Sequence, residues 1–352
     1  MKKVSIIGTV GIPACYGGFE SLVENLTKYS SDDVNYQVFC SSKSYSEKIP
    51  EYNSAELVYL PLSANGVQSV PYDILSMIRC LSIRPDVVLL LGVSGCMFLP
   101  IYRLFSRSKV VTNIDGLEWK RDKWGKIARK FLKLSEAIAV KYSDIIIADN
   151  QAIGDYVSNE YGKENVIIAY GGDHVISEKV SDVDKSDYYL SLCRIEPENN
   201  VSMILEAFSQ TDLKLKFVGN WDSSDFGRAL KSKYKSYSNI DIIDPIYDID
   251  ELFVLRSQCV GYVHGHSAGG TNPSLVEAMH FTTPIYAFDC NFNRYSTEEK
   301  SFYFSTSRDL VKCLIENAHN EEKLNFVASS MKGIADRRYT WEIIAKQYER
   351  LY

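Results

Sequence analysis

Residues 265–279, which read GHSAGGTNPSLVEAM, combine a glycine-rich loop with the start of a helix. Gly269 and Gly270 let the backbone approach a ligand with no side chain in between. Such a loop can bind an anion, but it can also simply cap an ordinary helix. The other motifs of the chain must decide between these two interpretations.

The helix after this loop has clear starting signals. Thr271 or Asn272 can serve as its N-cap, and Pro273 suits the first helical position, where a missing N–H costs nothing. Free N–H groups and the positive end of the helix dipole favour an anion such as a diphosphate. Glu277 lies one turn further on, where its carboxylate can accept hydrogen bonds from ribose hydroxyls.

A second glycine-rich loop, GTVGIPACYGGFE over residues 8–20, follows the predicted strand Val4–Ile7. Strand, glycine loop and helix in this order open a nucleotide-binding α/β domain. The loop lacks the GxGxxG spacing of the dinucleotide fingerprint. The pair Gly17 and Gly18 would bring backbone N–H groups to an anion from a second side.

Arg194 follows another predicted strand, Tyr188–Cys193. An arginine at the carboxyl end of a strand suits a diphosphate, because its planar fork matches phosphate oxygens. The alternative is a surface arginine paired with Glu196 or Glu198.

The segment after the predicted strand Val110–Asn113 is rich in charge and aromatic rings, beginning DGLEWKRDKW at Asp115. Residues 118–133 contain seven basic and two acidic side chains, in a chain whose net charge is −6. A basic helix with aromatics is typical of a face that docks on an anionic membrane surface. A solvated amphipathic helix packed on its own domain is the equally weighted alternative.

The composition limits the class of protein. A chain of 352 residues with 45% hydrophobic and 24% charged residues suits two soluble domains. The acidic balance gives no support for a nucleic-acid partner. The eight cysteines contain no CxxC pair, which favours reduced thiols in a cytosolic setting and no zinc site. We expect the basic N-terminus to be a strand rather than a signal peptide, and no apolar run is long enough to span a membrane.

Short apolar strands alternate with helices along the chain, which predicts an α/β fold with two Rossmann-like domains and mostly parallel sheets. We expect an N-terminal domain over 1–175, a C-terminal domain over 188–338, and a C-terminal helix over 339–352 that packs back towards the N-terminal domain. The polar segment 175–187 is the expected linker.

Taken together, these motifs resemble the retaining, metal-independent glycosyltransferases of family 4, over essentially the whole chain. The motifs GTVGIPACYGGFE, DGLEWKRDKW, CRIEPENN and GHSAGGTNPSLVEAM are similar to the bacterial rhamnosyltransferase branch. The resemblance implies two facing Rossmann-like domains of the GT-B type, with no cofactor beyond the nucleotide-sugar donor, dTDP-L-rhamnose. It also implies a lipid-diphosphate-linked saccharide acceptor in capsule, O-antigen or exopolysaccharide assembly, at the cytoplasmic face of the inner membrane.

The chain departs from the family pattern at three positions. Gly269 stands where the family has the first of two glutamates, while Glu277 matches the second. Asn199 replaces a lysine that follows the diphosphate arginine, and Asp115 replaces a histidine. In the family, the first glutamate contacts hydroxyls of the donor sugar. A 6-deoxy sugar presents a different edge, so the change at Gly269 can alter specificity for the donor sugar, or it can weaken catalysis.

The resemblance also implies roles for the candidate residues. The donor-binding set is Gly17, Gly18, Arg194, His266, Gly269, Gly270, Thr271, Asn272 and Glu277. The acceptor-side set is Tyr16, Trp119, Lys120 and Arg121. The catalytic set is Arg194, for charge on the leaving phosphate, with Asp115 and Glu118 as candidates to accept or orient the acceptor proton. No protein nucleophile and no metal are expected.

Three other functions stay open at this point. One is a transferase or epimerase that uses a UDP- or GDP-sugar, because no residue in the sequence identifies the base of the nucleotide. Another is a non-catalytic, transferase-like scaffold subunit. The third is a nicotinamide dehydrogenase, which the missing glycine fingerprint disfavours.

Overall fold

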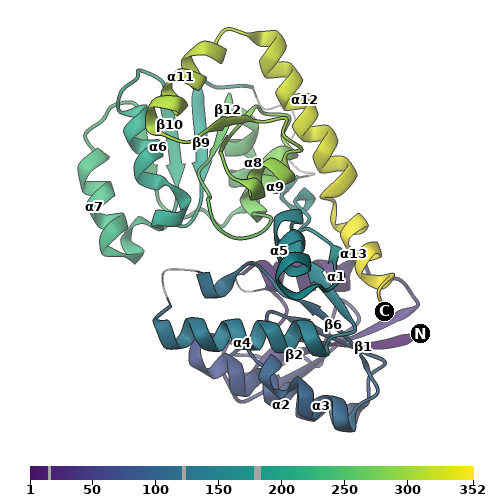
Figure 1. The fold of residues 1–352 in the computed structure, drawn as a ribbon. Coiled ribbons are helices and arrows are strands. Elements are labelled where there is room, and N and C mark those ends of the chain that lie inside the picture. The colour runs from purple at the N-terminus through teal and green to yellow at the C-terminus, as the bar shows by residue number, and fades with distance from the viewer. Residues whose placement is uncertain (15–16, 121–123, 178–183) are drawn as a thin grey trace. The chain divides into compact units, whose positions relative to one another are not determined.

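The computed structural model describes residues 1–14, 17–120, 124–177 and 184–352. The chain forms two compact units, Met1–Ala169 with Trp341–Tyr352, and Tyr170–Thr340. In each unit, mostly parallel strands form one sheet and alternate with helices (Figure 1). The predicted α/β fold class is therefore confirmed.

Among the described residues, the first unit contains an eight-stranded sheet in the order β3-β4-β2-β1-β5-β6-β7-β8. The strands are β1 (Lys2–Ile7), β2 (Val34–Ser41), β3 (Glu51–Tyr52), β4 (Ala55–Leu60), β5 (Val87–Leu91), β6 (Lys109–Asn113), β7 (Ile145–Ala148) and β8 (Val166–Ile167). All neighbours pair in parallel except β3 and β4. Strand order reverses between β1 and β5, so a ligand crevice is expected at their carboxyl ends.

Helices cover both faces of this first sheet. They are α1 (Gly18–Lys28), α2 (Ser69–Ile83), α3 (Leu99–Phe105), α4 (Lys126–Tyr142), α5 (Gln151–Tyr161) and α13 (Trp341–Glu349), with short 3-10 turns η1 (Gly66–Gln68), η2 (Cys96–Phe98) and η3 (Glu118–Lys120). The C-terminal helix α13 packs against α1. Lys2 Nζ donates to the carbonyl of Tyr352, so the two chain ends lie together.

Within the described residues, the second unit has a six-stranded parallel sheet in the order β11-β10-β9-β12-β13-β14. The strands are β9 (Tyr188–Leu192), β10 (Lys214–Val218), β11 (Ile240–Ile243), β12 (Gly261–His264), β13 (Ile285–Phe288) and β14 (Phe302–Phe304). The helices are α6 (Val201–Phe208), α7 (Asp225–Tyr234), α8 (Ile249–Gln258), α9 (Pro273–Met279), α10 (Asn291–Ser296), α11 (Ser307–Asn317) and α12 (Glu321–Arg338), with turns η4 (Asp173–Val175), η5 (Pro197–Asn199) and η6 (Trp221–Ser223). Here strand order reverses between β9 and β12.

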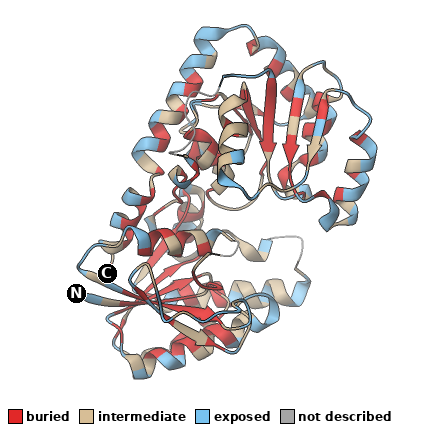
Figure 2. Ribbon diagram, turned by 180° about the vertical axis from the view of Figure 1, so that it is seen from behind, coloured by how far each residue is buried: buried red, intermediate tan, exposed pale blue. Residues whose placement is uncertain are grey.

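The sheets carry the cores, and the outer sides of the helices face solvent (Figure 2). Every residue of β5 is buried, as expected of a parallel strand covered on both faces. The three predicted strands Val4–Ile7, Val110–Asn113 and Tyr188–Cys193 are confirmed to within two residues.

The chain passes from the first unit to the second after Ala169, before the expected linker 175–187. The second unit begins at Tyr170, because the segment after it packs on that unit. Gly172 N donates to the Tyr339 carbonyl at 2.7 Å, and a Cβ atom on Gly172 would lie 2.8 Å from the backbone of α9. The remaining linker residues 178–183 lie outside the described residues.

Candidate functional site

The donor residues predicted in the second unit gather where strand order reverses, at the carboxyl ends of β9 and β12. Arg194 follows β9, and the loop that begins with Gly265 follows β12. The Arg194 side chain is 51% exposed, and its Nη2 atom lies 3.8 Å from Glu196 Oε2. Such a distant, exposed pair is weak, so the guanidinium can exchange it for a bound anion.

Asn199 joins the two segments at this point. Its side chain is buried; its Nδ2 donates to the Arg194 carbonyl at 2.7 Å, while its Oδ1 lies 2.7 Å from His266 Nδ1. A lysine has no acceptor and could not serve both neighbours. Asn199, which stands where the resemblance implies a lysine, therefore fixes the backbone of Arg194 and the ring of His266.

The loop before α9 has the predicted cap. Asn272 Oδ1 accepts from Ser274 N at 3.0 Å, and Pro273 is the first helical residue. Gly269 has φ of +110°, a conformation that L side chains rarely adopt, and a Cβ atom there would lie 3.3 Å from His266 Nε2. Gly270 is partly exposed beside it, and Thr271 is buried.

Glu277 is held by an arginine and lies near a histidine, neither of which sequence reasoning found. Its Oε2 is bonded to Nη2 of Arg256, which projects from α8 and is buried. Its Oε1 lies 3.6 Å from Nε2 of His174 in η4. The carboxylate side chain is 14% exposed, so it is oriented by the protein and still open to a ligand. No sequence pattern marks Arg256, because a buried arginine and a surface arginine look alike in a polar helix.

Three N–H groups in the first part of the glycine loop after β1 are bonded within the protein. Val10 N donates to Glu20 Oε1 at 2.8 Å, Gly11 N donates to the Thr9 hydroxyl, and Ala14 N donates to Glu24. These three N–H groups are satisfied by the protein's own carboxylates and hydroxyl, so they are not available to an anion. A carboxylate next to the loop would also repel a diphosphate.

The Gly17 and Gly18 pair sits at the start of α1. Gly17 is the N-cap with φ of +144°, and a Cβ atom there would lie 1.9 Å from Glu20 Oε2. Gly18 is the first helical residue. Only a glycine therefore fits at position 17. Tyr16, predicted on the acceptor side, lies outside the described residues.

Asp115 and Glu118 follow β6 at the carboxyl edge of the first sheet. Asp115 has φ of +60°, and its N–H donates to Asn113 Oδ1 at 2.9 Å. Asn113 in turn donates to the Tyr348 hydroxyl of α13 at 2.8 Å. Glu118 accepts the indole N–H of Trp124 at 3.0 Å. Local contacts thus hold the backbone of Asp115 and the carboxylate of Glu118, and both residues are partly exposed.

Trp119 is anchored by a buried carboxylate. Its indole N–H donates to Glu136 Oε2 at 3.1 Å, and Glu136 also accepts from the hydroxyls of Tyr156 and Tyr161, each at 2.6 Å. The Lys133 ammonium lies 4.8 Å, 4.8 Å and 4.9 Å from the ring centres of Trp119, Tyr156 and Tyr161. Such cation–π contacts favour this enclosed position.

The described basic residues of 118–133 therefore do not all point into solvent. Lys133 points into the aromatic cluster, Lys120 lies 5.3 Å from the Trp119 ring centre, and Arg129 Nε donates to the Trp124 carbonyl at 2.8 Å. Lys126 and Lys130 are exposed. Arg121, predicted on the acceptor side, lies outside the described residues.

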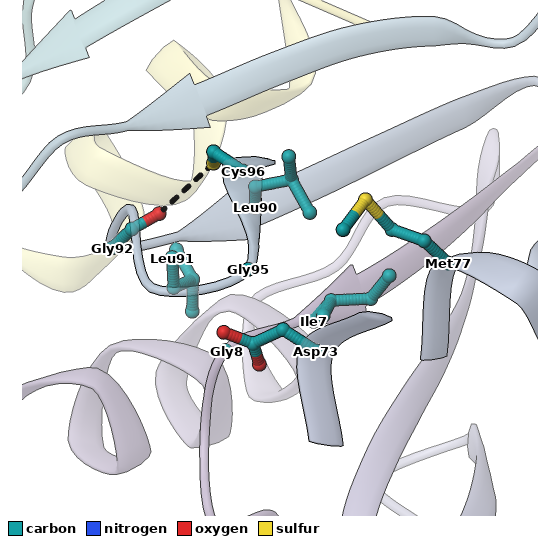
Figure 3. A pocket seen from close by; sticks show the side chains of 9 residues that line it. All are labelled: Ile7, Gly8, Asp73, Met77, Leu90, Leu91, Gly92, Gly95 and Cys96. Atoms are coloured by element: carbon teal, nitrogen blue, oxygen red, sulfur yellow. Dashed lines mark hydrogen bonds between the residues drawn. The ribbon is translucent and has the colours of Figure 1, made fainter. Parts of the chain in front are cut away.

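A small hollow lies where β1 and β5 end, between their last residues and α2 (Figure 3). Its lining includes Gly8, Gly92 and the buried carboxyl of Asp73, which accepts a hydrogen bond from Ser94 Oγ. Burial raises the pKa of Asp73 to about 7. The hollow has no room for a water-sized sphere, so it is a packing gap rather than a ligand site.

Comparisons with known proteins place these features in a fold class. Residues 1–173 match a family model described as a domain of unknown function, DUF1972. No curated protein sequence matches the chain. Sucrose-phosphate synthase from Thermosynechococcus elongatus has a similar structure, with a TM-score of 0.80 and 14% identity over 100% of this chain and 98% of that chain.

Two further solved structures are similar over nearly their full length. HepE from Anabaena, in complex with UDP, has a TM-score of 0.77 and 14% identity over 99% of each chain. A glycosyltransferase from Rickettsia africae has a TM-score of 0.73 and 12% identity, covering 100% of this chain and 97% of that chain. The chain thus has the two-domain GT-B fold that the resemblance implied. At these identities the likeness establishes the fold alone.

No group of three or more histidine, cysteine, aspartate or glutamate side chains in the described part of the chain is arranged to hold a metal ion. None of the helices described has an apolar stretch long enough to cross a membrane.

Proposed function

We propose that this protein is a glycosyltransferase whose second unit binds a nucleoside-diphosphate sugar. The observation that carries the proposal is the full-length GT-B likeness combined with Arg194, His266 and Glu277 at the point where strand order reverses. The solved HepE structures contain UDP or UDP-glucose, which supports a nucleotide-sugar as the ligand class. Open α/β sheets bind their ligands at this position.

Each donor residue has a proposed role. Arg194 neutralises charge on the leaving diphosphate, and Glu277 accepts hydrogen bonds from the ribose hydroxyls. Because Arg256 and His174 already orient that carboxylate, it is preorganised for the ribose. His266 faces the donor sugar in place of the absent family glutamate at Gly269.

The finer specificity rests on the motifs. We propose dTDP-L-rhamnose as the donor, a lipid-diphosphate-linked saccharide as the acceptor, and retention of configuration without a metal. The product would belong to capsule, O-antigen or exopolysaccharide assembly, with the protein peripheral on the cytoplasmic face of the membrane. On the acceptor side, Asp115 or Glu118 would orient the acceptor hydroxyl, and Trp119 would pack on a sugar ring.

The test is a thermal-shift panel on purified protein without metal, using dTDP, UDP, GDP, ADP and NAD. A ligand at 100 times its dissociation constant adds about 2.7 kcal/mol of stability. We expect a shift with dTDP that disappears in Arg194→Ala. Arg228→Ala is the matched control, because Arg228 is also 51% exposed and pairs with a nearby carboxylate in the same unit.

The other outcomes separate the alternatives. A shift with UDP or GDP alone would keep the transferase class and overturn the rhamnose assignment, leaving a UDP- or GDP-sugar transferase or epimerase. A shift with NAD alone would favour the dehydrogenase. No shift with any nucleotide would favour a non-catalytic scaffold subunit. If dTDP binds, transfer from dTDP-L-rhamnose to a glucosyl-diphosphate-lipid should fall about 100–1000-fold in Arg194→Ala.

A further inference from the structure

His266 is held in place by its neighbours in the second unit. Its carbonyl accepts from Asn293 Nδ2 at 2.9 Å, and the N–H of the next residue, Ser267, donates to the Glu198 carbonyl at 2.9 Å. His266 itself is only 9% exposed. It therefore lacks the freedom of a surface histidine, and the protonation of its two ring nitrogens decides which groups it can bind.

Asn199 decides which ring nitrogen carries the proton. The Arg194 carbonyl can only accept, so the Asn199 side-chain atom that lies 2.7 Å from it is the amide nitrogen. The amide oxygen then lies 2.7 Å from His266 Nδ1. Because this oxygen can only accept, Nδ1 is the donor. In the neutral ring the proton is therefore on Nδ1, and Nε2 is a hydrogen-bond acceptor.

His280 provides a contrast within the same unit. Its Nε2 atom lies 3.1 Å from the Tyr339 carbonyl. A carbonyl oxygen can only accept, so the Nε2 atom of His280 carries a proton. The two histidines therefore differ in the state of Nε2, and in each case a neighbouring oxygen determines that state.

The Nε2 atom of His266 lies beside Gly269. A Cβ atom on Gly269 would be 3.3 Å from this nitrogen, and Gly269 is partly exposed. Asn199 also links His266 to the backbone of Arg194, the residue proposed to bind the diphosphate. In a nucleotide sugar, the sugar is bonded directly to the diphosphate. Its hydroxyls are therefore the groups best placed to meet an acceptor in this loop.

We propose that Asn199 is a positioning residue that holds His266 in the Nδ1–H form, so that Nε2 accepts a hydrogen bond from a hydroxyl of the donor sugar. The inference rests on the proposed function for the identity of the ligand. It adds the direction of the hydrogen bond, in which the sugar is the donor. It also links two departures from the resembled pattern, because Asn199 fixes the imidazole and Gly269 leaves room beside it.

The protonation state is tested by nitrogen-15 NMR of histidine-labelled protein at mildly alkaline pH, without ligand. The signals are assigned by their loss in His266→Asn and in His280→Asn. We expect a proton on Nδ1 and none on Nε2 of His266, and a proton on Nε2 of His280. Asn199→Ala should lose the single Nδ1–H form, because no oxygen then accepts from Nδ1. A proton on Nε2 of His266 in the unchanged protein, or an unaltered His266 in Asn199→Ala, would overturn the proposal.

Two replacements of His266 separate the roles of its ring nitrogens. In His266→Asn the amide nitrogen is as many bonds from the backbone as Nδ1, so it can still donate to Asn199, but no atom reaches the position of Nε2. In His266→Gln the amide oxygen is as many bonds away as Nε2 and can accept from a hydroxyl.

Calorimetric titration compares dTDP-L-rhamnose and UDP-glucose with dTDP and UDP. For the nucleotide sugar that the unchanged protein binds, His266→Asn should weaken binding about tenfold, as expected for one lost hydrogen bond. The matching nucleotide should be affected much less, and His266→Gln should regain most of the loss. Equal losses for nucleotide and nucleotide sugar, or equal losses in the two variants, would overturn the proposal.

The matched control is His319→Asn, which makes the same change at an exposed residue between α11 and α12. This variant should bind every ligand as the unchanged protein does. If no nucleotide and no nucleotide sugar binds the unchanged protein, the proposed function fails, and this inference fails with it. If they bind and replacing His266 does not selectively weaken binding of the sugar, only this inference fails.

Discussion

At the scale of single residues, the candidate donor site depends on charges that are compensated inside the protein. Glu277 is paired with buried Arg256, so the carboxylate reaches the ligand side already oriented. Removing one member of a buried pair leaves the other charge without compensation.

We expect Arg256→Met to destabilise the second unit by about 3–5 kcal/mol, because the Glu277 carboxylate then loses its buried cation. Urea unfolding measures the change. The double variant Arg256→Met with Glu277→Gln should recover part of the loss. Free-energy changes that simply add in this cycle would mean that the two side chains are not coupled.

A second prediction concerns Asp73 in the hollow of Figure 3. Burial raises the pKa of Asp73 from 3.8 to about 7, so the folded protein holds this proton more tightly than the unfolded chain. The contribution to stability is present in full below about pH 4 and declines as the pH rises towards 7, by up to about 1.4 kcal/mol for each pH unit. Asp73→Asn should remove this decline. A parallel pH dependence for both proteins in chemical unfolding would contradict the assignment.

Part of the residue-level site could be predicted from sequence alone. The Asn272 cap and Pro273 were predictable because both act on neighbouring backbone groups. Asn199 and Arg256 were not, because their partners lie on other elements and only the folded chain brings them together. A polar side chain in the sequence does not reveal which buried group it will meet.

At the scale of elements, the two glycine loops are stabilised in different ways. The loop after β1 is closed by carboxylates of the helix that follows it, whereas the loop before α9 is shaped by a glycine in a left-handed conformation. Sequence patterns predicted both strand–loop–helix units. They did not predict that Glu20 would satisfy the first loop, because glycine spacing does not report which groups bind the loop's N–H donors.

We expect Gly269→Glu, which introduces the glutamate that the resemblance implies, to lower stability by about 1–3 kcal/mol, because φ of +110° strains any L side chain. Transferase activity should not rise, since the new side chain would crowd His266. Gly125→Ala is the control, because Gly125 has open space and an ordinary negative φ. A stable and more active Gly269→Glu enzyme would show that the loop adapts, and that the family glutamate is compatible with this site.

At the scale of the whole molecule, the first unit is completed by the last residues of the chain. Tyr348 and Trp341 of α13 are almost fully buried in it, and Tyr348 bonds to Asn113, which in turn holds the backbone of Asp115. The family model over residues 1–173 therefore describes a unit without its final helix.

We expect Tyr348→Phe to destabilise the first unit by about 1–3 kcal/mol, because the buried amide of Asn113 loses its acceptor. The stability of the second unit should not change. Hydrogen exchange resolved by segment can follow the two units separately. Equal loss of protection in both units would show that they unfold as one.

The meeting of the chain ends also sets an order for biosynthesis. The second unit is continuous in sequence, so all of its residues have been synthesised once the ribosome has passed Thr340. The synthesis of the first unit begins earlier, but the unit is complete only after residues 341–352 have been added. These residues pack on α1 and supply the hydrogen-bond acceptor of Asn113. The domain that starts first is therefore the last to close, and its unfinished face stays uncovered during translation.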